Sequence, residues 1–267
     1  MIKKHWNSIK YVLGLCVLLL ILFNISRFLR FIIFVLLDIS YDSIFANITV
    51  IVMHAMVFMV VIGVGLKDQQ KTISSVCFFK KVNGVVWGAA IVCSIGYIFF
   101  DYYLYFLFYS FKYGWNTDFM ETEENFLINL INTALIPAVA EELLFKGIIF
   151  TILKKYYSII VAVIIASLMF AACHLSYFYF ISHFLFSCFS FWLYLRSGNL
   201  ILPMLLHFIN NLFTFVLISA PFSYVGTFYA AIILLVIGSY ILYKYSKTER
   251  NAGIATVPDT QQSKREK

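Results

Sequence analysis

Eight apolar stretches divide the 267-residue chain, and short polar or charged segments separate them. A helix needs about 20 apolar residues to cross the hydrocarbon core of a bilayer, so each stretch predicts a transmembrane helix. Only 12% of the residues are charged, whereas a soluble domain carries about 25%. The sequence therefore predicts an all-α polytopic membrane protein. The predicted spans cover residues 11–37, 45–66, 83–109, 125–153, 157–175, 177–195, 199–219 and 225–244.

Basic residues are concentrated in alternate loops, and the loops between them are acidic or poor in Lys and Arg. The positive-inside rule then predicts that both termini are cytoplasmic, as an even number of spans requires. The net charge is +7, and the basic residues lie in loops and tails beside apolar spans. This arrangement predicts contact with anionic lipid of the bilayer and no nucleic-acid partner. The basic loops and tails contain Lys3, Lys4, Lys10, Lys67, Lys71, Lys80, Lys81, Lys154, Lys155, Arg196, Lys244, Lys247 and Arg250, and the acidic loops contain Asp38, Asp42, Asp118, Glu121, Glu123 and Glu124.

The spans group into four regions along the chain. Residues 1–124 hold the first three spans, residues 125–217 hold a predicted catalytic core, and residues 218–244 hold the last span. The tail at 245–267 is polar and predicted to be disordered. The five cysteines have neither a disulfide-framework nor a zinc-ribbon spacing.

Two adjacent acids, Glu141 and Glu142, lie inside an apolar stretch that runs from Phe126 to Phe150. A carboxylate at the bilayer centre costs roughly 2.5 to 3.5 kcal/mol on insertion scales, so these acids are expected to face a protein interior or a wet cavity. Lys146 stands four residues after Glu142, in the order that favours an ion pair on one helical face.

Glu141 lies about 100° around the same helix from Glu142, so the two acids are expected to have different roles. We expect Glu141 to face a cavity, where it can serve as a general base. Pro137 lies four residues earlier and is expected to kink the helix and make room for water. The alternative reading is structural, with both acids bridging helices through buried hydrogen bonds.

Histidines in later spans supply candidate partners for these acids. His174 lies four residues after Phe170, and His207 and Asn211 share one face of a later helix with four residues between them. His54 and His183 are predicted to be hydrogen-bonded core residues.

These residues form an ordered set of three motifs in the predicted core. The set resembles the CAAX-protease and bacteriocin-processing family of intramembrane proteases. The family usually carries arginine where this chain has Lys146, which keeps the charge but not the bidentate fork. The motif residues are Glu141, Glu142 and Lys146, then Phe170 and His174, then His207 and Asn211.

The resemblance implies an endopeptidase that acts within or beside the membrane. It implies that Glu141 and His174 activate a water molecule, and that His207 and Asn211 stabilise the oxyanion. Glu142 and Lys146 then support the site. These roles agree with the general need for an oriented base and preorganised oxyanion donors.

The cofactor is left open between none and zinc. Glu141, His174 and His207 could hold zinc with a fourth position open for water. The chain lacks a His-Glu-x-x-His helix, and the amide of Asn211 suits an oxyanion better than zinc. A metal-independent glutamate mechanism is therefore favoured.

Two other function classes fit parts of the sequence. One is a catalytically silent immunity or scaffold protein that binds a membrane peptide or a sensor kinase. The other is a transporter with a proton relay at Glu141 and Glu142, although no duplicated half supports it. Oligomeric state is left open.

The residue usage is rich in Phe, Ile and Tyr, which is typical of a low-GC bacterium. The resemblance implies prenylated substrates in eukaryotic members and bacteriocins or signalling precursors in bacterial members. We therefore expect a multi-pass protein of the bacterial cytoplasmic membrane. Its expected substrate is a membrane-associated peptide or protein, in bacteriocin self-immunity or pheromone processing.

Overall fold

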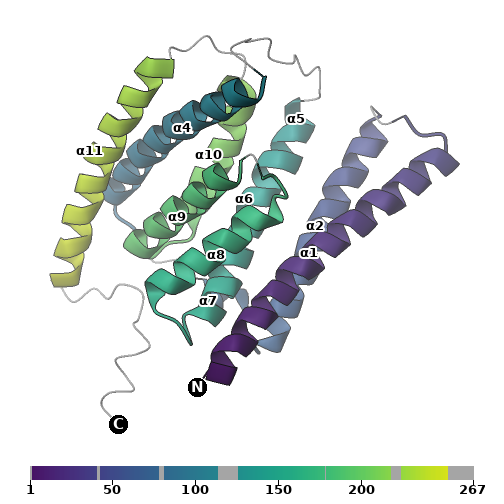
Figure 1. Ribbon diagram of the computed structural model, residues 1–267, viewed down its shortest axis with the longest axis horizontal. Helices are drawn as coiled ribbons and strands as arrows, with labels where there is room; N and C mark the ends of the chain where they lie inside the picture. Colours follow the sequence, from purple (N-terminus) through teal and green to yellow (C-terminus); the bar gives the residue numbers. More distant parts are fainter. Residues whose placement is uncertain are drawn as a thin grey trace. The chain divides into compact units, whose positions relative to one another are not determined.

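Helices make up every regular element of the described chain (Figure 1). The computed structural model describes residues 2–40, 43–77, 81–113, 126–177, 179–217 and 224–251. No strand occurs among these residues. The predicted acidic loop with Asp118, Glu121, Glu123 and Glu124 lies outside them.

The chain forms two compact units, each built from two separate parts of the sequence. Unit 1 comprises residues 1–76 and 121–169, and unit 2 comprises residues 77–120 and 170–267. Helix α8 (Ile159–Cys173) starts in unit 1, and its last turn belongs to unit 2. Each unit is described by itself below.

Four helices are long and apolar enough to cross a membrane, within the described ranges. They coincide with the first three predicted spans and the last one, so the chain is a multi-pass membrane protein. The total of eight spans and the cytoplasmic termini stay predictions. The four crossing segments are His5–Leu36, Ile44–Asp68, Gly84–Phe108 and Gly226–Tyr245.

Unit 1 is built on two long helices, α1 (Ile2–Leu36) and α2 (Ile44–Asp68), which pack side by side (Figure 1). The ring of Phe23 on α1 meets the rings of His54 and Phe58 on α2, each at 5.2 Å between centroids. The prediction placed the start of the first span at residue 11, but the helix already begins at Ile2. Polar residues near the N-terminus do not end a helix when no Gly or Pro intervenes.

One end of unit 1 gathers the segments predicted to be cytoplasmic. Tyr11 Oη donates to Asp68 at 2.9 Å, Tyr157 Oη donates to the His5 carbonyl at 2.9 Å, and Lys155 Nζ donates to Gln69 at 2.6 Å. The start of α1, the end of α2 and the turn after α7 (Phe150–Leu153) therefore lie together. This grouping follows the predicted alternation of loops.

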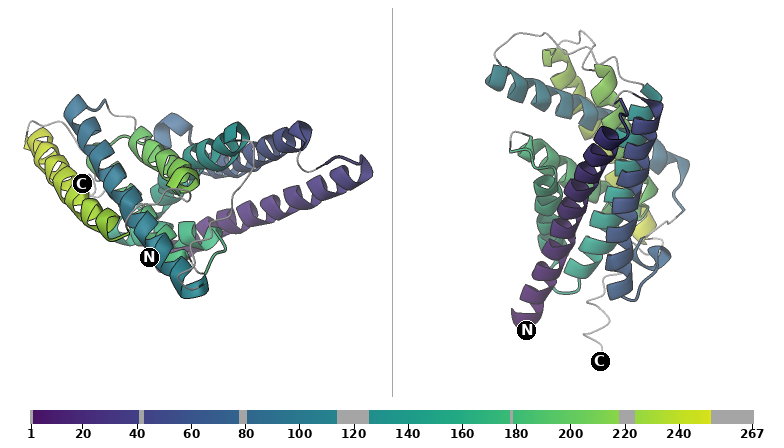
Figure 2. Two further views of the ribbon diagram at one scale, coloured as in Figure 1. Left: turned by 90° about the horizontal axis from the view of Figure 1, so that it is seen from above. Right: turned by 90° about the vertical axis from the view of Figure 1, so that its right-hand side faces the viewer.

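Unit 2 is built around α4 (Gly84–Tyr113) and α11 (Tyr224–Asn251), which run in close contact (Figure 2). Gly96 and Gly238 allow this approach. A Cβ atom on Gly96 would lie 2.9 Å from the Leu235 backbone nitrogen, and one on Gly238 would lie 2.9 Å from the Cys93 nitrogen. The prediction ended the last span at residue 244, whereas α11 continues to Asn251. The start of the predicted disordered tail is therefore helical, and residues 252–267 lie outside the described chain.

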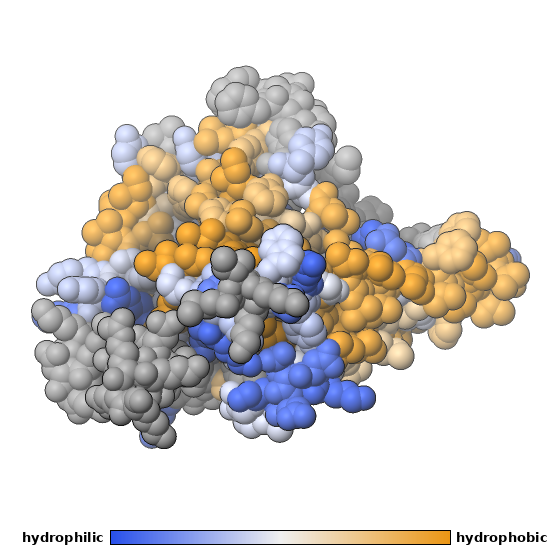
Figure 3. All heavy atoms as spheres, turned by 60° about the horizontal axis from the view of Figure 1, so that its bottom comes forward, coloured by the Kyte–Doolittle hydropathy of each residue, from blue (hydrophilic) through white to orange (hydrophobic). Residues whose placement is uncertain are grey.

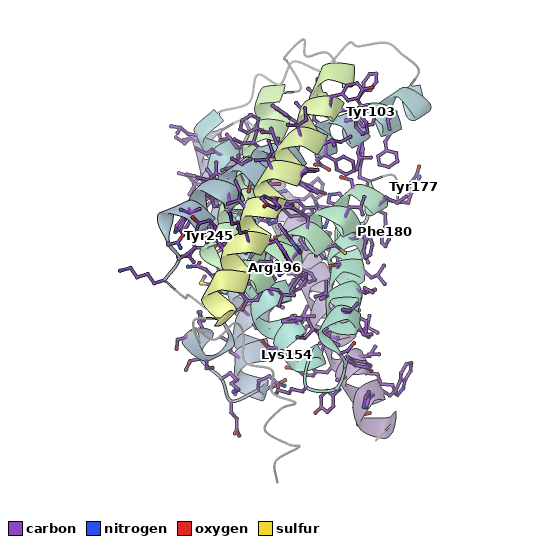
Figure 4. All side chains as sticks on the ribbon, turned by 90° about the vertical axis from the view of Figure 1, so that its left-hand side faces the viewer. Tyr103, Lys154, Tyr177, Phe180, Arg196 and Tyr245 are labelled. Carbon is purple, nitrogen blue, oxygen red and sulfur yellow. The ribbon has the colours of Figure 1, made fainter. Side chains whose placement is uncertain are left out.

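Helices α9 (Phe180–Ser197) and α10 (Ile201–Leu217) complete unit 2. Gly198, at φ 63°, makes the turn between them. The guanidinium of Arg196 lies 5.6 Å from the centre of the Tyr243 ring on α11. Figure 4 labels Arg196 and, near the same end of α11, Tyr245. The basic end of α9 and the basic end of α11 thus lie together, as predicted for two cytoplasmic ends.

Much of the apolar side-chain surface is exposed, and orange covers large parts of the face in Figure 3. On α11, Val236 is 63% exposed and Ile233 is 57% exposed. Soluble monomers rarely expose contiguous apolar surface of this kind, whereas a bilayer covers it.

Candidate active site

The acid pair lies on a run of short helical segments in unit 1, residues 126–153. Two π-helical stretches, η1 (Leu130–Leu135) and η2 (Leu143–Ile149), interrupt the α-helical hydrogen-bonding pattern. Between them stands α6 (Ile136–Glu142), which carries Glu141 and Glu142 in its last turn. The sequence predicted one helix with a kink at Pro137. Pro137 is the second residue of α6, which directly follows η1, and π-helical stretches are frequent at functional sites.

Glu142 and Lys146 form the ion pair that their spacing predicts. The carboxylate Oε2 and the ammonium Nζ are in direct contact, and both side chains are only 1% exposed. Two desolvated charges are tolerated because each neutralises the other. Removing either partner would leave the other charge buried without this counter-ion.

The surroundings of this pair are densely packed. Every residue from Leu144 to Phe150 is buried. Gly65 on α2 faces η2 so closely that a Cβ there would lie 2.9 Å from Ile148 Cγ2. Close packing by α2 therefore fixes the backbone that carries Lys146.

Glu141 is less buried than Glu142, so the two adjacent acids have different surroundings. The segment before it is tied to α2 by a hydrogen bond of 2.8 Å between His54 Nδ1 and Asn132 Oδ1. This bond confirms His54 as a hydrogen-bonded histidine. It also ties η1 to α2 at Asn132, nine residues before Glu141.

His174 directly follows the last residue of α8, in unit 2. Its Nδ1 lies 2.9 Å from the Phe170 carbonyl. A carbonyl only accepts, so Nδ1 carries the proton, and Nε2 of the neutral ring has a lone pair. Leu175, at φ 52°, ends the chain turn there. The backbone therefore sets both the tautomer and the direction of His174.

Three histidines and two phenylalanines form one ring cluster in unit 2. His174 stacks on His183 with centroids 4.0 Å apart and planes 24° apart, and it contacts Phe170 at 4.7 Å. His207 contacts Phe186 at 4.9 Å and Phe170 at 6.0 Å. Both motif histidines therefore contact the ring of Phe170.

The sequence analysis treated His183 as an ordinary core histidine. Its Nδ1 donates to the Tyr179 carbonyl at 2.8 Å, so the predicted hydrogen bond is present. Its stack against His174 was missed. No local spacing signals it, because the two residues come from different helical segments.

His207 is 3% exposed and lies on α10 together with Asn211. Asn199 caps this helix, with its Oδ1 accepting from the Ile201 amide at 2.7 Å. The regular α-helix keeps His207 and Asn211 on one face, as their spacing predicts.

Asp101 is an acid of unit 2 that the sequence analysis missed. It lies on α4 within a candidate membrane span. Ser182 Oγ on α9 donates to its Oδ1, and Asn210 Nδ2 on α10 donates to its Oδ2 at 3.4 Å. The signal that singled out Glu141 and Glu142, an ionisable residue inside an apolar stretch, also applies to Asp101.

The predicted site residues fall into two sets. Glu141, Glu142 and Lys146 belong to unit 1, and the remaining four belong to unit 2. Within unit 2, Phe170, His174 and His207 lie in the ring cluster, whereas Asn211 is placed by helix geometry. The catalytic roles of all seven residues stay predictions.

A metal site requires several donor side chains close together. Within each of the two units, no three or more His, Cys, Asp or Glu side chains of the described residues gather so that they could hold a metal ion. His174 has the Nδ1-to-carbonyl hydrogen bond that metal-ligating histidines also use, so its Nε2 suits either a base or a ligand. The zinc set of Glu141, His174 and His207 draws on both units and stays an alternative prediction.

The comparisons with known proteins bear on this part of the chain. Residues 123–213 match a protein family described as type II CAAX prenyl endopeptidase Rce1-like. The match covers about a third of the chain, and all seven motif residues lie within it. No curated protein and no solved structure matches this chain. The family resemblance drawn from the three motifs is therefore confirmed, and it extends over residues 123–213, which are similar to the Rce1-like CAAX endopeptidases.

Proposed function

We propose that the protein is an intramembrane endopeptidase that hydrolyses a peptide bond of a membrane-associated peptide or protein. The observation that carries the proposal is the Rce1-like match over residues 123–213, which contains both acids, both motif histidines and the asparagine. The intact Glu142–Lys146 pair and the oriented tautomer of His174 support it.

In the proposed reaction, Glu141 takes a proton from water while the water oxygen attacks the scissile carbonyl carbon. His174, with its Nε2 lone pair, holds the same water by accepting a hydrogen bond. The carbonyl oxygen becomes an oxyanion, for which His207 and Asn211 supply hydrogen-bond donors. The carbon–nitrogen bond then breaks, and the proton passes from Glu141 to the leaving amine.

The other residues have supporting roles. Glu142 and Lys146 neutralise each other and fix the turn that carries Glu141. Phe170 packs against the rings of both histidines and restricts their rotation. Zinc remains the alternative way to activate the water; if bound, it would supply a Lewis acid held by Glu141, His174 and His207.

The proposed substrate is a bacteriocin or pheromone precursor in the bacterial cytoplasmic membrane. This choice rests on the bacterial residue usage, because the family description itself names prenylated substrates. The alternative is a silent immunity protein that keeps the fold without the reaction.

The test is cleavage of two internally quenched peptides by purified protein in detergent. The peptides share one sequence, and only one of them carries a farnesylated cysteine. Glu141→Gln and His174→Ala are each expected to lower kcat at least about 100-fold, as the loss of a general base does. Asp68→Asn, an acid far along the sequence in unit 1 that bonds Tyr11, is the matched control and should keep full activity.

The outcomes separate the alternatives. Cleavage of the plain peptide favours precursor processing, and cleavage of only the farnesylated peptide favours a prenyl endopeptidase. Activity that a chelator removes and zinc restores would assign the metal mechanism. Equal rates for the wild type and Glu141→Gln would contradict the catalytic proposal and favour the immunity role.

A further inference from the structure

Asp101 is a carboxylate of unit 2 whose hydrogen bonds join three helices. It stands on α4, and its two oxygens accept from Ser182 on α9 and Asn210 on α10. A polar side chain within a membrane span is costly unless it is paired, so these two bonds explain how Asp101 is tolerated. They also hold α9 and α10 to one point on α4.

Both donors are sequence neighbours of the histidine and amide groups of unit 2. Ser182 precedes His183, whose ring stacks on His174 at 4.0 Å. Asn210 precedes Asn211 and follows His207 by three residues on α10. Rotation of either helix would therefore move one of these groups.

The ring cluster alone does not fix the rotation of α9 and α10 about their axes. Its contacts with His207 are edge contacts to Phe170 and Phe186, at 6.0 and 4.9 Å between centroids. Aromatic contacts favour offset and edge geometries but accept a range of them, so they restrain the rotation of a helix less sharply than a hydrogen bond does. Hydrogen bonds weaken steeply with misalignment, which makes the bonds to Asp101 directional restraints.

We propose that Asp101 is a positioning residue for the reaction proposed above. Through Ser182 it sets the rotation of α9 and so the position of the His183 ring, which stacks on His174. Through Asn210 it sets the rotation of α10 and so the donors at His207 and Asn211. It touches neither substrate nor water, and the inference rests on the proposed function.

The first test compares kcat and KM of Asp101→Leu with those of the wild type. Leu has a similar branched shape but accepts no hydrogen bond. We expect kcat to fall about 10-fold or more with KM nearly unchanged, because misplacement of catalytic groups by about 1 Å costs up to 100-fold. Ser94→Ala is the matched control on α4, since its hydroxyl bonds only the Ala90 carbonyl of its own helix.

Conservative and partner variants separate positioning from general stability. Asp101→Asn keeps an acceptor for Ser182 and, with the Asn210 amide turned over, a bond to α10, so it should retain most of kcat. The variant that combines Ser182→Ala with Asn210→Leu already lacks both hydrogen bonds to Asp101. Adding Asp101→Leu to it should therefore lower kcat no further. A further loss there, or a lower melting temperature with unchanged kcat in Asp101→Leu, overturns the proposal.

Hydrogen exchange distinguishes failure of this inference from failure of the proposed function. Asp101→Leu is expected to speed amide exchange in α9 and α10 more than in α11. If the wild type cleaves no faster than Glu141→Gln, the proposed function fails, and the catalytic part of this inference fails with it. Unchanged exchange in α9 and α10 would then show that the three-helix restraint is absent as well.

Discussion

The two units of this protein accommodate acids within apolar helices in different ways. In unit 1, Glu142 is neutralised by Lys146, four residues along the same helical run. In unit 2, Asp101 is satisfied by Ser182 and Asn210, which lie 81 and 109 residues away. The first pair forms wherever the local helix forms. The second arrangement exists only when three helices have already packed.

This difference teaches how each unit can be disturbed. A local ion pair depends on two side chains, so its loss leaves one buried charge at a single point. A three-helix hydrogen-bonding centre depends on helix rotation, so its loss spreads along two helices. We expect loss of the ion pair to lower the free energy of unfolding, and loss of the hydrogen bonds to Asp101 to lower kcat.

The largest effect is expected from Lys146→Ala, which leaves Glu142 buried without its cation. The free energy of unfolding should fall by about 3 to 5 kcal/mol. The double variant Glu142→Leu with Lys146→Met removes both charges and should cost far less. Thermal unfolding in detergent measures all of them, with Lys146→Arg as the charge-conserving control. A double variant as unstable as Lys146→Ala would show that the pair stabilises by more than mutual neutralisation.

The next effect tests whether unit 2 depends on helix packing as closely as the comparison requires. Gly96→Ala places a Cβ 2.9 Å from the backbone of α11, so either the helices separate or the backbone shifts. We expect a loss of about 1 to 3 kcal/mol. Gly88→Ala, on the same helix with nothing within 4 Å of its Cβ, should be neutral or stabilising by up to about 1 kcal/mol. Equal melting temperatures for the two variants would refute the close α4–α11 contact.

The smallest effect concerns the basic end of unit 1. Burial and, secondarily, the nearby charge of Lys71 lower the pKa of Lys155. The unfolded chain therefore binds more protons, and stability rises with pH as it approaches the ordinary lysine value of 10.5. Lys71→Gln should make this rise shallower, with a change of only a few tenths of a kcal/mol because the site is exposed. Melting temperatures measured from pH 8 to pH 10 check it, and a steeper rise would contradict the assignment.

Much of the fold and of the local chemistry could be predicted from the sequence. Apolar length and loop charge predicted the helical membrane class and the four long spans, because bilayer thickness fixes how many apolar residues a helix needs. The pairing of Glu142 with Lys146 followed from helical periodicity alone. The family resemblance followed from the order of three motifs, and the match over residues 123–213 confirmed it.

Other features could not be read from spacing. The π-helical stretches η1 and η2 lie on either side of α6 along the chain and contact α2, and no residue pattern predicts them. The stack of His183 on His174 joins two helical segments across a turn. Asp101 could have been noticed as a charge in an apolar stretch, but its partners could not.

The sequence by itself determined which segments are helices, which charges pair within a turn, and which family motifs the chain carries. These properties depend on neighbours within about four residues, whose positions the helix fixes in advance. Only the tertiary structure decided that Asp101 joins α9 and α10, that three histidines share one ring cluster, and that Gly96 and Gly238 meet the facing helix. Those contacts depend on how the helices rotate and pack. Rotation and packing are determined jointly by residues that lie far apart in the chain.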